Sequence, residues 1–169
     1  MSLKKKSAAN IRHLLDKKIS SVIRQFNIDK KPLGSKRDIT YTEFLSDKML
    51  MISVIRNGVP YSLFNLIQHY APFSEIDWAN FLGISAKSLQ RYKQSSKIFK
   101  STQSEKIIEM AEVTHVGLEV FGNIDKFKLW LDTSNYALGG LKPMELLKDS
   151  YGKEMVIGEL TRIGHGILV

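Results

Sequence analysis

The stretch Glu75–Gln94, which reads EIDWANFLGISAKSLQRYKQ, is the part of this sequence that decides the fold. Ser74 stands just before it and can cap a helix, because its hydroxyl oxygen accepts hydrogen bonds from N–H groups that the first turn leaves free. Asp77 follows three residues later, as in a capping box. Gly83 can end this helix, since glycine enters the left-handed region without a steric penalty. We therefore expect a short helix that stops at a tight turn.

A second helix is expected directly after the turn. Ser85 can cap it, and it should run from Ala86 to about Gln94. In the first helix, the small side chain of Ala79 would let another helix approach closely. Apolar residues recur where two helices crossing at a steep angle would share a core, namely at Trp78, Leu82, Ile84, Leu89 and Tyr92. This spacing is typical of a DNA-binding helix-turn-helix.

The outer face of the second helix carries hydrogen-bond donors that suit phosphates and base edges. The candidate DNA-binding residues are Lys87, Ser88, Gln90, Arg91 and Lys93. Arg91 is the candidate for contact with a base edge, with contact to phosphate as the alternative.

The composition indicates a globular and mostly helical chain. It has 169 residues, 43% of them hydrophobic, which is enough to bury a core in one domain or two small ones. It has no cysteine, which excludes disulfides and thiolate metal sites and favours a reducing compartment. No apolar run is long enough to span a membrane, and no signal-peptide core follows the N-terminus. We therefore expect a soluble, cytoplasmic protein without membrane contact.

Positive charge is concentrated in two places. Residues 1–57 hold 13 of the 25 Lys and Arg residues and 5 of the 17 Asp and Glu residues, which accounts for the whole net charge of +8. Residues 86–106 add six basic residues against one acid, whereas residues 107–169 hold six basic and nine acidic residues. This pattern suggests an anionic polymer as the partner of one end and a different partner for the other end.

The segment before the helix-turn-helix is expected to be helical in three parts. Apolar residues at helical spacing in residues 11–26 predict one amphipathic helix of about five turns. Its stripe should pack on the body of the protein or on a second subunit, with a basic arm along DNA or an anionic membrane as the alternative. After a linker at residues 28–40, residues 42–56 are read as one helix with Met49 and Ile52 on its apolar side. Residues 61–70 are read as the next helix.

Further helices are expected after the basic linker at residues 95–100. Thr102 and Glu105 suggest a capping box for a long helix that ends near Phe121. A short helix capped by Asn123 should follow. The remaining expected elements are a turn at residues 135–143 in which Gly139 and Gly140 take positive φ, a short helix from Pro143 to Lys148, a break at Gly152, a last helix to about Ile163, and an irregular end at residues 164–169.

Nothing in the sequence is typical of an enzyme. The segment Gly139–Lys142 lacks the length and the GK[ST] ending of a phosphate-binding loop. His165 has no obvious nucleophile partner, and the histidines show no spacing of metal ligands. Glu105, Glu109 and Glu112 share one helix face and are read as ordinary solvated charges. We expect no catalytic residue, no metal and no cofactor.

Short motifs along the last two thirds of the chain match a known family. Before and within the helix-turn-helix they are Arg56-Asn-Gly-Val-Pro60, Leu82-Gly-Ile-Ser85, Leu89 and Arg91, and Ser104 follows. The most specific pattern comes next: Val120-Phe-Gly122, Trp130-Leu131, Asn135, Leu138-Gly-Gly140, Pro143, Leu146-Leu147, Gly152, Val156, Leu160, Arg162-Ile163 and His165-Gly166. From about residue 56 onward the chain resembles the Xre/MbcA/ParS antitoxins, the DNA-binding partners of RES-domain toxins.

The chain departs from the pattern of this family at the recognition helix. Lys87 and Ser88 stand where a basic residue and threonine are usual, and Tyr92 replaces a second basic residue after Arg91. These differences put the operator sequence in doubt. Residues 1–55 match the family only loosely, and no role is carried over to them.

The resemblance implies an all-α protein with a helix-turn-helix domain followed by a small helical toxin-binding domain. We expect a basic N-terminal helical extension at residues 1–57, the DNA-binding domain at residues 58–122 and the toxin-binding domain at residues 123–169. Such a protein would be the antitoxin of a type II toxin-antitoxin system. It would form a homodimer, repress its own operon by binding operator DNA, and neutralise a RES-like toxin that degrades NAD.

The resemblance also implies that the toxin is held inactive when the C-terminal end of the antitoxin lies at the entrance of the toxin's active site. The candidate toxin-binding residues are therefore Arg162, His165, Gly166, Ile167, Leu168 and Val169. The surface around Trp130–Leu147 is the alternative place of contact, although most of its apolar residues are expected to be core. The alternative function is a stand-alone helix-turn-helix regulator of transcription whose C-terminal domain dimerises or senses a ligand.

Overall fold

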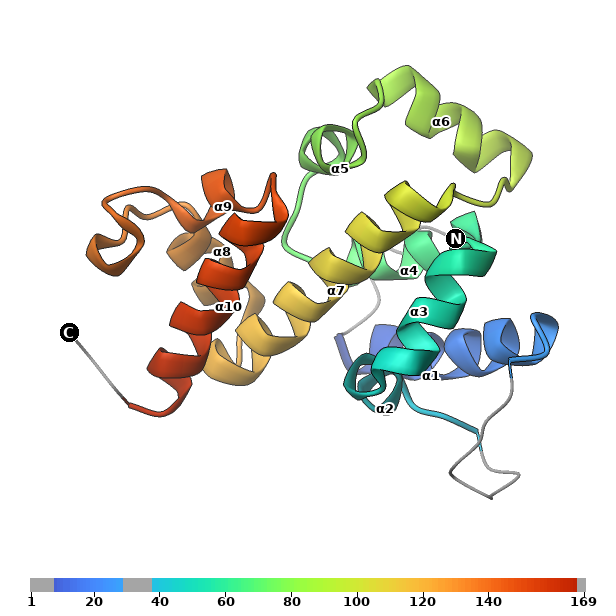
Figure 1. Ribbon diagram of the computed structural model, residues 1–169, viewed down its shortest axis with the longest axis horizontal. Coiled ribbons are helices and arrows are strands. Elements are labelled where there is room, and N and C mark those ends of the chain that lie inside the picture. Colours follow the sequence, from blue (N-terminus) through green and yellow to red (C-terminus); the bar gives the residue numbers. More distant parts are fainter. Residues whose placement is uncertain (1–7, 29–37, 167–169) are drawn as a thin grey trace.

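The computed structural model describes residues 8–28 and 38–166, and helices dominate this part of the chain (Figure 1). The elements are α1 (Ala8–Gln25), α2 (Tyr41–Ser46), α3 (Lys48–Asn57), α4 (Tyr61–Tyr70), α5 (Glu75–Leu82), α6 (Ala86–Ser95), α7 (Ser101–Phe121), α8 (Ile124–Leu131), the 3-10 turn η2 (Tyr136–Leu138), α9 (Pro143–Leu146) and α10 (Ser150–Gly164). The expected all-α fold is confirmed.

The long helix α7 lies at the centre of the molecule. It contacts α2, α3, α4 and α5 on one side and α8 and α10 on the other. Figure 1 shows α5 and α6 at one end of the molecule and α8–α10 at another, with α7 running between them. Ile107, Met110, Ala111 and Val113 of α7 are all buried, so this helix is enclosed on more than one face. It therefore connects the helix-turn-helix to the C-terminal helices.

The apolar stripe of α1 packs on the body of the protein, as expected. Leu15, Ile19 and Val22 are fully buried, and α1 contacts α4 and α2. The carboxylate of Asp16 accepts a hydrogen bond from the backbone N–H of Tyr41 at 2.7 Å, which attaches α1 to the start of α2. The expected linker that follows α1 lies mostly outside the described residues.

The single helix expected at residues 42–56 is wrong, because the chain breaks at Asp47 into α2 and α3. Asp47 is extended (φ −107°, ψ 99°), and its carboxylate accepts hydrogen bonds from the N–H groups of Met49 and Leu50, so that it caps α3. The break changes which side chains face inward. Met49 and Ile52 are 68% and 39% exposed, whereas Met51 is buried.

The junction between α3 and α4 explains the motif Arg56-Asn-Gly-Val-Pro60. The segment after α6 returns here and pairs with the chain: Phe99 donates its N–H to Val59 at 2.9 Å, and Tyr61 donates to the carbonyl of Lys97 at 3.0 Å. The hydroxyl of Ser104, buried in α7, accepts from the N–H of Val59 and donates to the carbonyl of Phe99. These contacts hold α4, the end of α6 and the start of α7 together.

Two further helix boundaries differ from expectation. The helix α7 begins at Ser101, and its first turn is capped by Gln103, whose side chain accepts from the N–H of Lys100, so the box of Thr102 with Glu105 is wrong. Gly152 does not break the chain but lies inside α10, which Asp149 caps. A Cβ on Gly152 would lie 2.0 Å from the carbonyl oxygen of Leu146, so glycine permits the close approach of α9 and α10.

Candidate nucleic-acid interface and partner surface

The turn between α5 and α6 has the predicted capping. The hydroxyl of Ser74 accepts from the N–H of Asp77 at 3.1 Å, and the carboxylate of Asp77 accepts from the N–H of Ser74 at 2.8 Å. Gly83 ends α5 in the left-handed conformation, with φ 62° and ψ 34°. The hydroxyl of Ser85 then accepts from the N–H of Ser88 at 3.1 Å and starts α6. The helix-turn-helix prediction is confirmed.

A cluster of aromatic residues forms part of the core next to the helix-turn-helix. The indole of Trp78 is fully buried and meets the rings of Phe64, Phe73 and Phe81 at centroid distances of 5.1, 5.6 and 6.1 Å. Leu89 is the buried residue of α6 and is 2% exposed. The predicted shared core of the two helices is therefore present, and it sets which face of α6 points outward.

Tyr92 has a structural role in the packing of α6. Its ring stacks on Phe99 with a centroid distance of 4.4 Å and an interplanar angle of 1°. Its hydroxyl donates to the side chain of Gln103 at 3.2 Å, and Gln103 also caps α7. Tyr92 thus joins α6 to α7 and does not belong to the outer face.

The candidate DNA-binding residues of α6 divide into a central face and two edges. Successive helical residues are about 100° apart, and Leu89 marks the inner side. Lys87 and Arg91 then lie on the outer face and are exposed. Gln90, which is exposed, and Ser88, which is half-buried, each lie about 100° from Leu89 and border this face on either side. Lys93 is exposed but lies about 40° from Leu89, near the inner side. The predicted face therefore centres on Lys87 and Arg91.

Two of the outer side chains are oriented by neighbours. The guanidinium of Arg91 donates to the hydroxyl of Ser88 at 3.0 Å, and the amide of Gln90 donates to the carboxylate of Glu75 on α5 at 2.8 Å. Ser88 therefore positions Arg91 within α6. A hydrogen bond from Gln90 to a base would have to replace its bond to Glu75.

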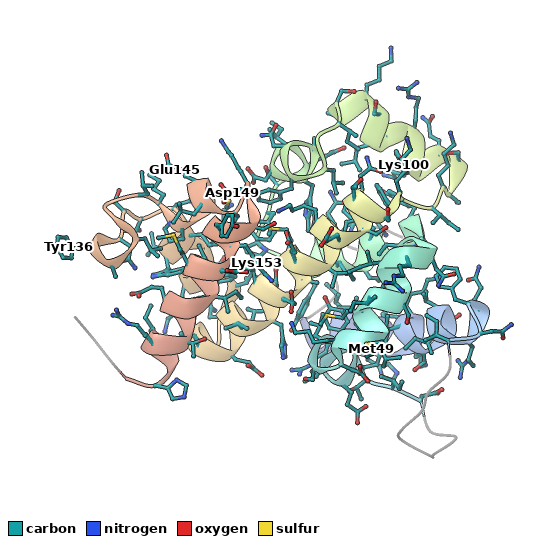
Figure 2. All side chains as sticks on the ribbon, viewed as in Figure 1. Met49, Lys100, Tyr136, Glu145, Asp149 and Lys153 are labelled. Atoms are coloured by element: carbon teal, nitrogen blue, oxygen red, sulfur yellow. The ribbon has the colours of Figure 1, made fainter. Side chains whose placement is uncertain are left out.

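Other residues around α6 were missed as candidates. Gln94 is exposed and lies on the outer face, about 20° from Lys87 by helical phase and on the side away from Arg91. Lys97 and Lys100 follow α6 and are exposed, and Figure 2 shows Lys100 near the junction of α6 with α7. Their charge was visible in the sequence as a basic linker. The pairing of this segment with Val59 and Tyr61, which holds it beside α6, was not.

The last turn of α10 is organised by a buried carboxylate. Glu159 is 8% exposed, and its Oε2 lies 3.5 Å from Nε of Arg162. Its other oxygen, Oε1, accepts from the side-chain amide of Asn135 at 3.4 Å. Arg162, a predicted toxin-binding residue, is thus held in place by Glu159 and retains 37% side-chain exposure.

The end of the described chain is more regular than expected. The helix α10 continues through Gly164, and His165 follows it with Nδ1 2.7 Å from the carbonyl oxygen of Thr161. Gly166 takes φ 72° and donates its N–H to Ile163. His165 and Gly166 are exposed. The other predicted toxin-binding residues, Ile167, Leu168 and Val169, lie outside the described residues.

The surface around Trp130–Leu147 is partly core. Pro143 and Leu147 are buried, and Trp130 and Leu146 are half-buried, as the expectation of core required. The ring of Trp130 lies 5.7 Å from that of Phe121. The same surface also carries Leu129 and Tyr136, which are 68% and 91% exposed.

Glu109 and Glu112 of α7 are paired and are not ordinary solvated charges, so that interpretation is wrong for these two residues, whereas Glu105 is exposed. Glu112 accepts hydrogen bonds from Nζ of Lys48 at 2.8 Å and from Nζ of Lys153 at 2.9 Å. Glu109 pairs with Lys106 at 2.6 Å. Only 17% of the side chain of Glu112 and 14% of that of Glu109 are exposed.

Neither a metal site nor a membrane-spanning helix is found in the described part of the chain. No group of three or more His, Cys, Asp or Glu side chains there could hold a metal ion. Among the same residues, no helix is long and apolar enough to cross a membrane.

Comparison with known proteins identifies two domains in the chain. Residues 50–112 match the antitoxin Xre-like helix-turn-helix domain, and residues 117–166 match the antitoxin Xre/MbcA/ParS C-terminal toxin-binding domain. The chain is also 26% identical over 117 residues to the antitoxin Xre of Photorhabdus laumondii subsp. laumondii, covering 69% of this chain and 79% of that protein. The chain belongs to the Xre/MbcA/ParS family of antitoxins.

A solved structure resembles the antitoxin as well. It is a chain of the crystal structure of the M. tuberculosis MbcT-MbcA toxin-antitoxin complex, with a TM-score of 0.49 and 21% sequence identity. The match covers 57% of the antitoxin and 86% of that chain.

Proposed function

We propose that this antitoxin neutralises a RES-like, NAD-degrading toxin and represses its own operon by binding operator DNA as a homodimer. The observation that carries the proposal is the pairing of two family domains, one described as a helix-turn-helix and the other as toxin-binding. The exposed basic face of α6 and the last turn of α10 lie on different parts of the molecule (Figure 1). One protomer could therefore contact DNA and toxin without the two partners competing for one surface. Such an antitoxin would act in the cytoplasm.

The DNA-binding part of the proposal assigns Lys87, Arg91 and Lys93 to the duplex. A lysine or arginine that neutralises a phosphate releases a counterion, so binding weakens steeply with salt. Each lost phosphate contact should flatten the slope of log K against log salt by about one unit. If Arg91 instead reads a base edge, Arg91→Ala should cost about 1–3 kcal/mol on the cognate site and relax specificity there.

The test of DNA binding compares wild type with the alanine variants of Lys87, Arg91 and Lys93 on the promoter of its own gene, titrated at several salt concentrations. Lys17→Ala is the matched control, because it removes the same charge from an exposed position on α1. Figure 1 shows α1 at the end of the molecule away from α6. A folded triple variant that binds as well as wild type would refute the role of α6.

The toxin-binding part of the proposal assigns the inhibitory contact to Arg162, His165, Gly166 and the three residues after them. The test is co-expression with the reading frame next to the antitoxin gene, asking whether wild-type antitoxin relieves growth arrest. Truncation after Gly166 should weaken rescue while helicity, dimerisation and operator binding stay near wild type. Full rescue by the truncated protein would exclude Ile167, Leu168 and Val169 from the inhibitory contact. If the neighbouring gene causes no arrest, or truncation disturbs dimerisation and DNA binding together, a stand-alone regulator is favoured.

A further inference from the structure

One exposed loop of the toxin-binding domain is used neither by α6 nor by the last turn of α10. It comprises residues 135–142 between α8 and α9, and we name it the Tyr136 loop. Tyr136 is 91% exposed and Leu141 is 49% exposed. Figure 2 shows Tyr136 at the outer edge of the molecule, with its side chain pointing away from the other helices. A large ring in this position contributes little to the antitoxin's own core.

The Tyr136 loop is nevertheless held rigidly. The carbonyl oxygen of Asn135 accepts from the N–H groups of Leu138 at 3.1 Å and Gly140 at 3.0 Å, and the N–H of Asn135 donates to the carbonyl of Leu141 at 3.0 Å. The side-chain oxygen of Asn135 accepts from the N–H of Ala137 at 2.9 Å. Leu138 is 3% exposed and anchors the loop in the core. An aromatic side chain on such a loop loses little conformational entropy when it binds a partner.

The Tyr136 loop is also connected to the proposed toxin contact. Glu159 is buried and bonds to Asn135 at the base of the loop through one oxygen, while its other oxygen lies beside Arg162. One side chain therefore links the loop to the last turn of α10. The loop and Arg162 form one continuous end of the molecule.

We propose that the Tyr136 loop is a second docking surface for the toxin, where Tyr136 and Leu141 enter an apolar depression of that protein. The inference rests on the proposed function. Exposed aromatic residues dominate the binding energy of many protein interfaces, and this one lies in the domain matched as toxin-binding. DNA does not fit, because Lys142 is followed by the acid Glu145.

The test measures the affinity of the full-length antitoxin for the purified product of the adjacent toxin gene by calorimetry. Tyr136→Ala should weaken binding roughly 10–100-fold, as expected for an interface hot spot. Tyr136→Phe keeps the ring and should bind within about threefold of wild type. Tyr151→Ala is the matched control, because Tyr151 is 83% exposed in the same domain but lies on the first turns of α10. Operator affinity and melting temperature should not change in any of them.

The possible results distinguish a failure of the docking surface from a failure of the proposed function. Wild-type antitoxin that binds the toxin, with Tyr136→Ala equally tight, overturns the docking surface and leaves the proposed function standing. An equal loss of toxin affinity in Tyr136→Ala and Tyr151→Ala also overturns the docking surface, because the loss would then not be specific to the loop. Wild-type antitoxin that fails to bind the toxin overturns the proposed function and the loop with it. If the loss of toxin affinity in Tyr136→Ala multiplies with the loss caused by truncation after Gly166, the loop and the C-terminal tail make two separate contacts with the toxin.

Discussion

At the scale of single residues, glycines in this antitoxin serve different physical purposes. Gly58 has φ 89°, and a Cβ built there would lie 2.5 Å from the carbonyl oxygen of Phe99. Gly83 also has positive φ, but nothing lies within 4 Å of its Cβ position. Gly158 lies within α10, with open space around it and no unusual φ. Gly58 is thus required by both close packing and backbone conformation, Gly83 by backbone conformation alone, and Gly158 by neither.

Alanine at these three positions should give three different stabilities. Gly58→Ala should cost about 3–5 kcal/mol, because it adds a steric clash to a backbone conformation that favours glycine. Gly83→Ala should cost about 1–2 kcal/mol for the left-handed conformation alone. Gly158→Ala should stabilise the antitoxin by about 0.5–1 kcal/mol, since alanine is the better helix former. Urea unfolding at one temperature ranks the three, and Gly58→Ala milder than Gly83→Ala would contradict the close approach of Phe99.

At the scale of elements, sequence reasoning succeeded where a helix end depends on near neighbours. Ser74, Asp77, Gly83 and Ser85 act within a few residues of themselves, so their caps could be read directly. Asp47 is an exception: its bonds to Met49 and Leu50 are just as local, but it was missed because apolar residues continue on both sides of it. Gly152 was misread for a different reason: the carbonyl of Leu146 that requires it belongs to a helix packed against it.

The outer face of α6 was predictable in outline, because Leu89 sets its helical phase. Tyr92 could not be assigned from its neighbours, since Phe99 and Gln103 reach it only after the chain has turned back. The link from Asn135 through Glu159 to Arg162 also joins residues distant in sequence, since Asn135 and Glu159 are 24 positions apart. Contacts between residues so far apart in the chain leave no recognisable pattern in the local sequence.

The packing of α6 on α5 leads to a prediction about Leu89. Leu89→Ala should cost about 2–5 kcal/mol, because it leaves a cavity in a well-packed site. Affinity for operator DNA should fall only to the extent that the helix-turn-helix becomes less stable. Tyr92→Phe should cost about 1 kcal/mol, the usual value for one lost hydrogen bond, and keep the stack on Phe99. Thermal unfolding measures both, and an unchanged melting temperature in Leu89→Ala would place this residue on the surface.

At the scale of the whole molecule, Glu112 joins three helices that are far apart in sequence. Lys48 of α3 and Lys153 of α10 are 64 and 41 positions from it, and each bonds to a different oxygen of its carboxylate. The helix-turn-helix half and the toxin-binding half therefore share one charged contact. Sequence reasoning placed Glu112 on a solvated face, because its partners come from helices whose packing on α7 was not predicted.

The shared contact makes the antitoxin sensitive to acid in a defined direction. Burial by itself raises the pKa of Glu112, but hydrogen bonds and charge from Lys48 and Lys153 outweigh burial, so the pKa lies below the ordinary value of 4.5. A carboxyl with a lowered pKa stabilises the folded state above its unfolded pKa, and this contribution disappears as the pH falls through the folded pKa.

Glu112→Gln should therefore cost about 1–3 kcal/mol near pH 7, because Lys153 loses a charged partner at a site that is only 17% exposed. The difference from wild type should stay constant as the pH falls toward about 5.5. It should shrink below pH 4.5, where protonated Glu112 comes to resemble glutamine. Urea unfolding of both proteins between pH 7 and 3 measures the difference, with Glu154→Gln as the control on an exposed glutamate of α10. A difference that does not change over this whole range would show that the charge of Glu112 does not join the two halves.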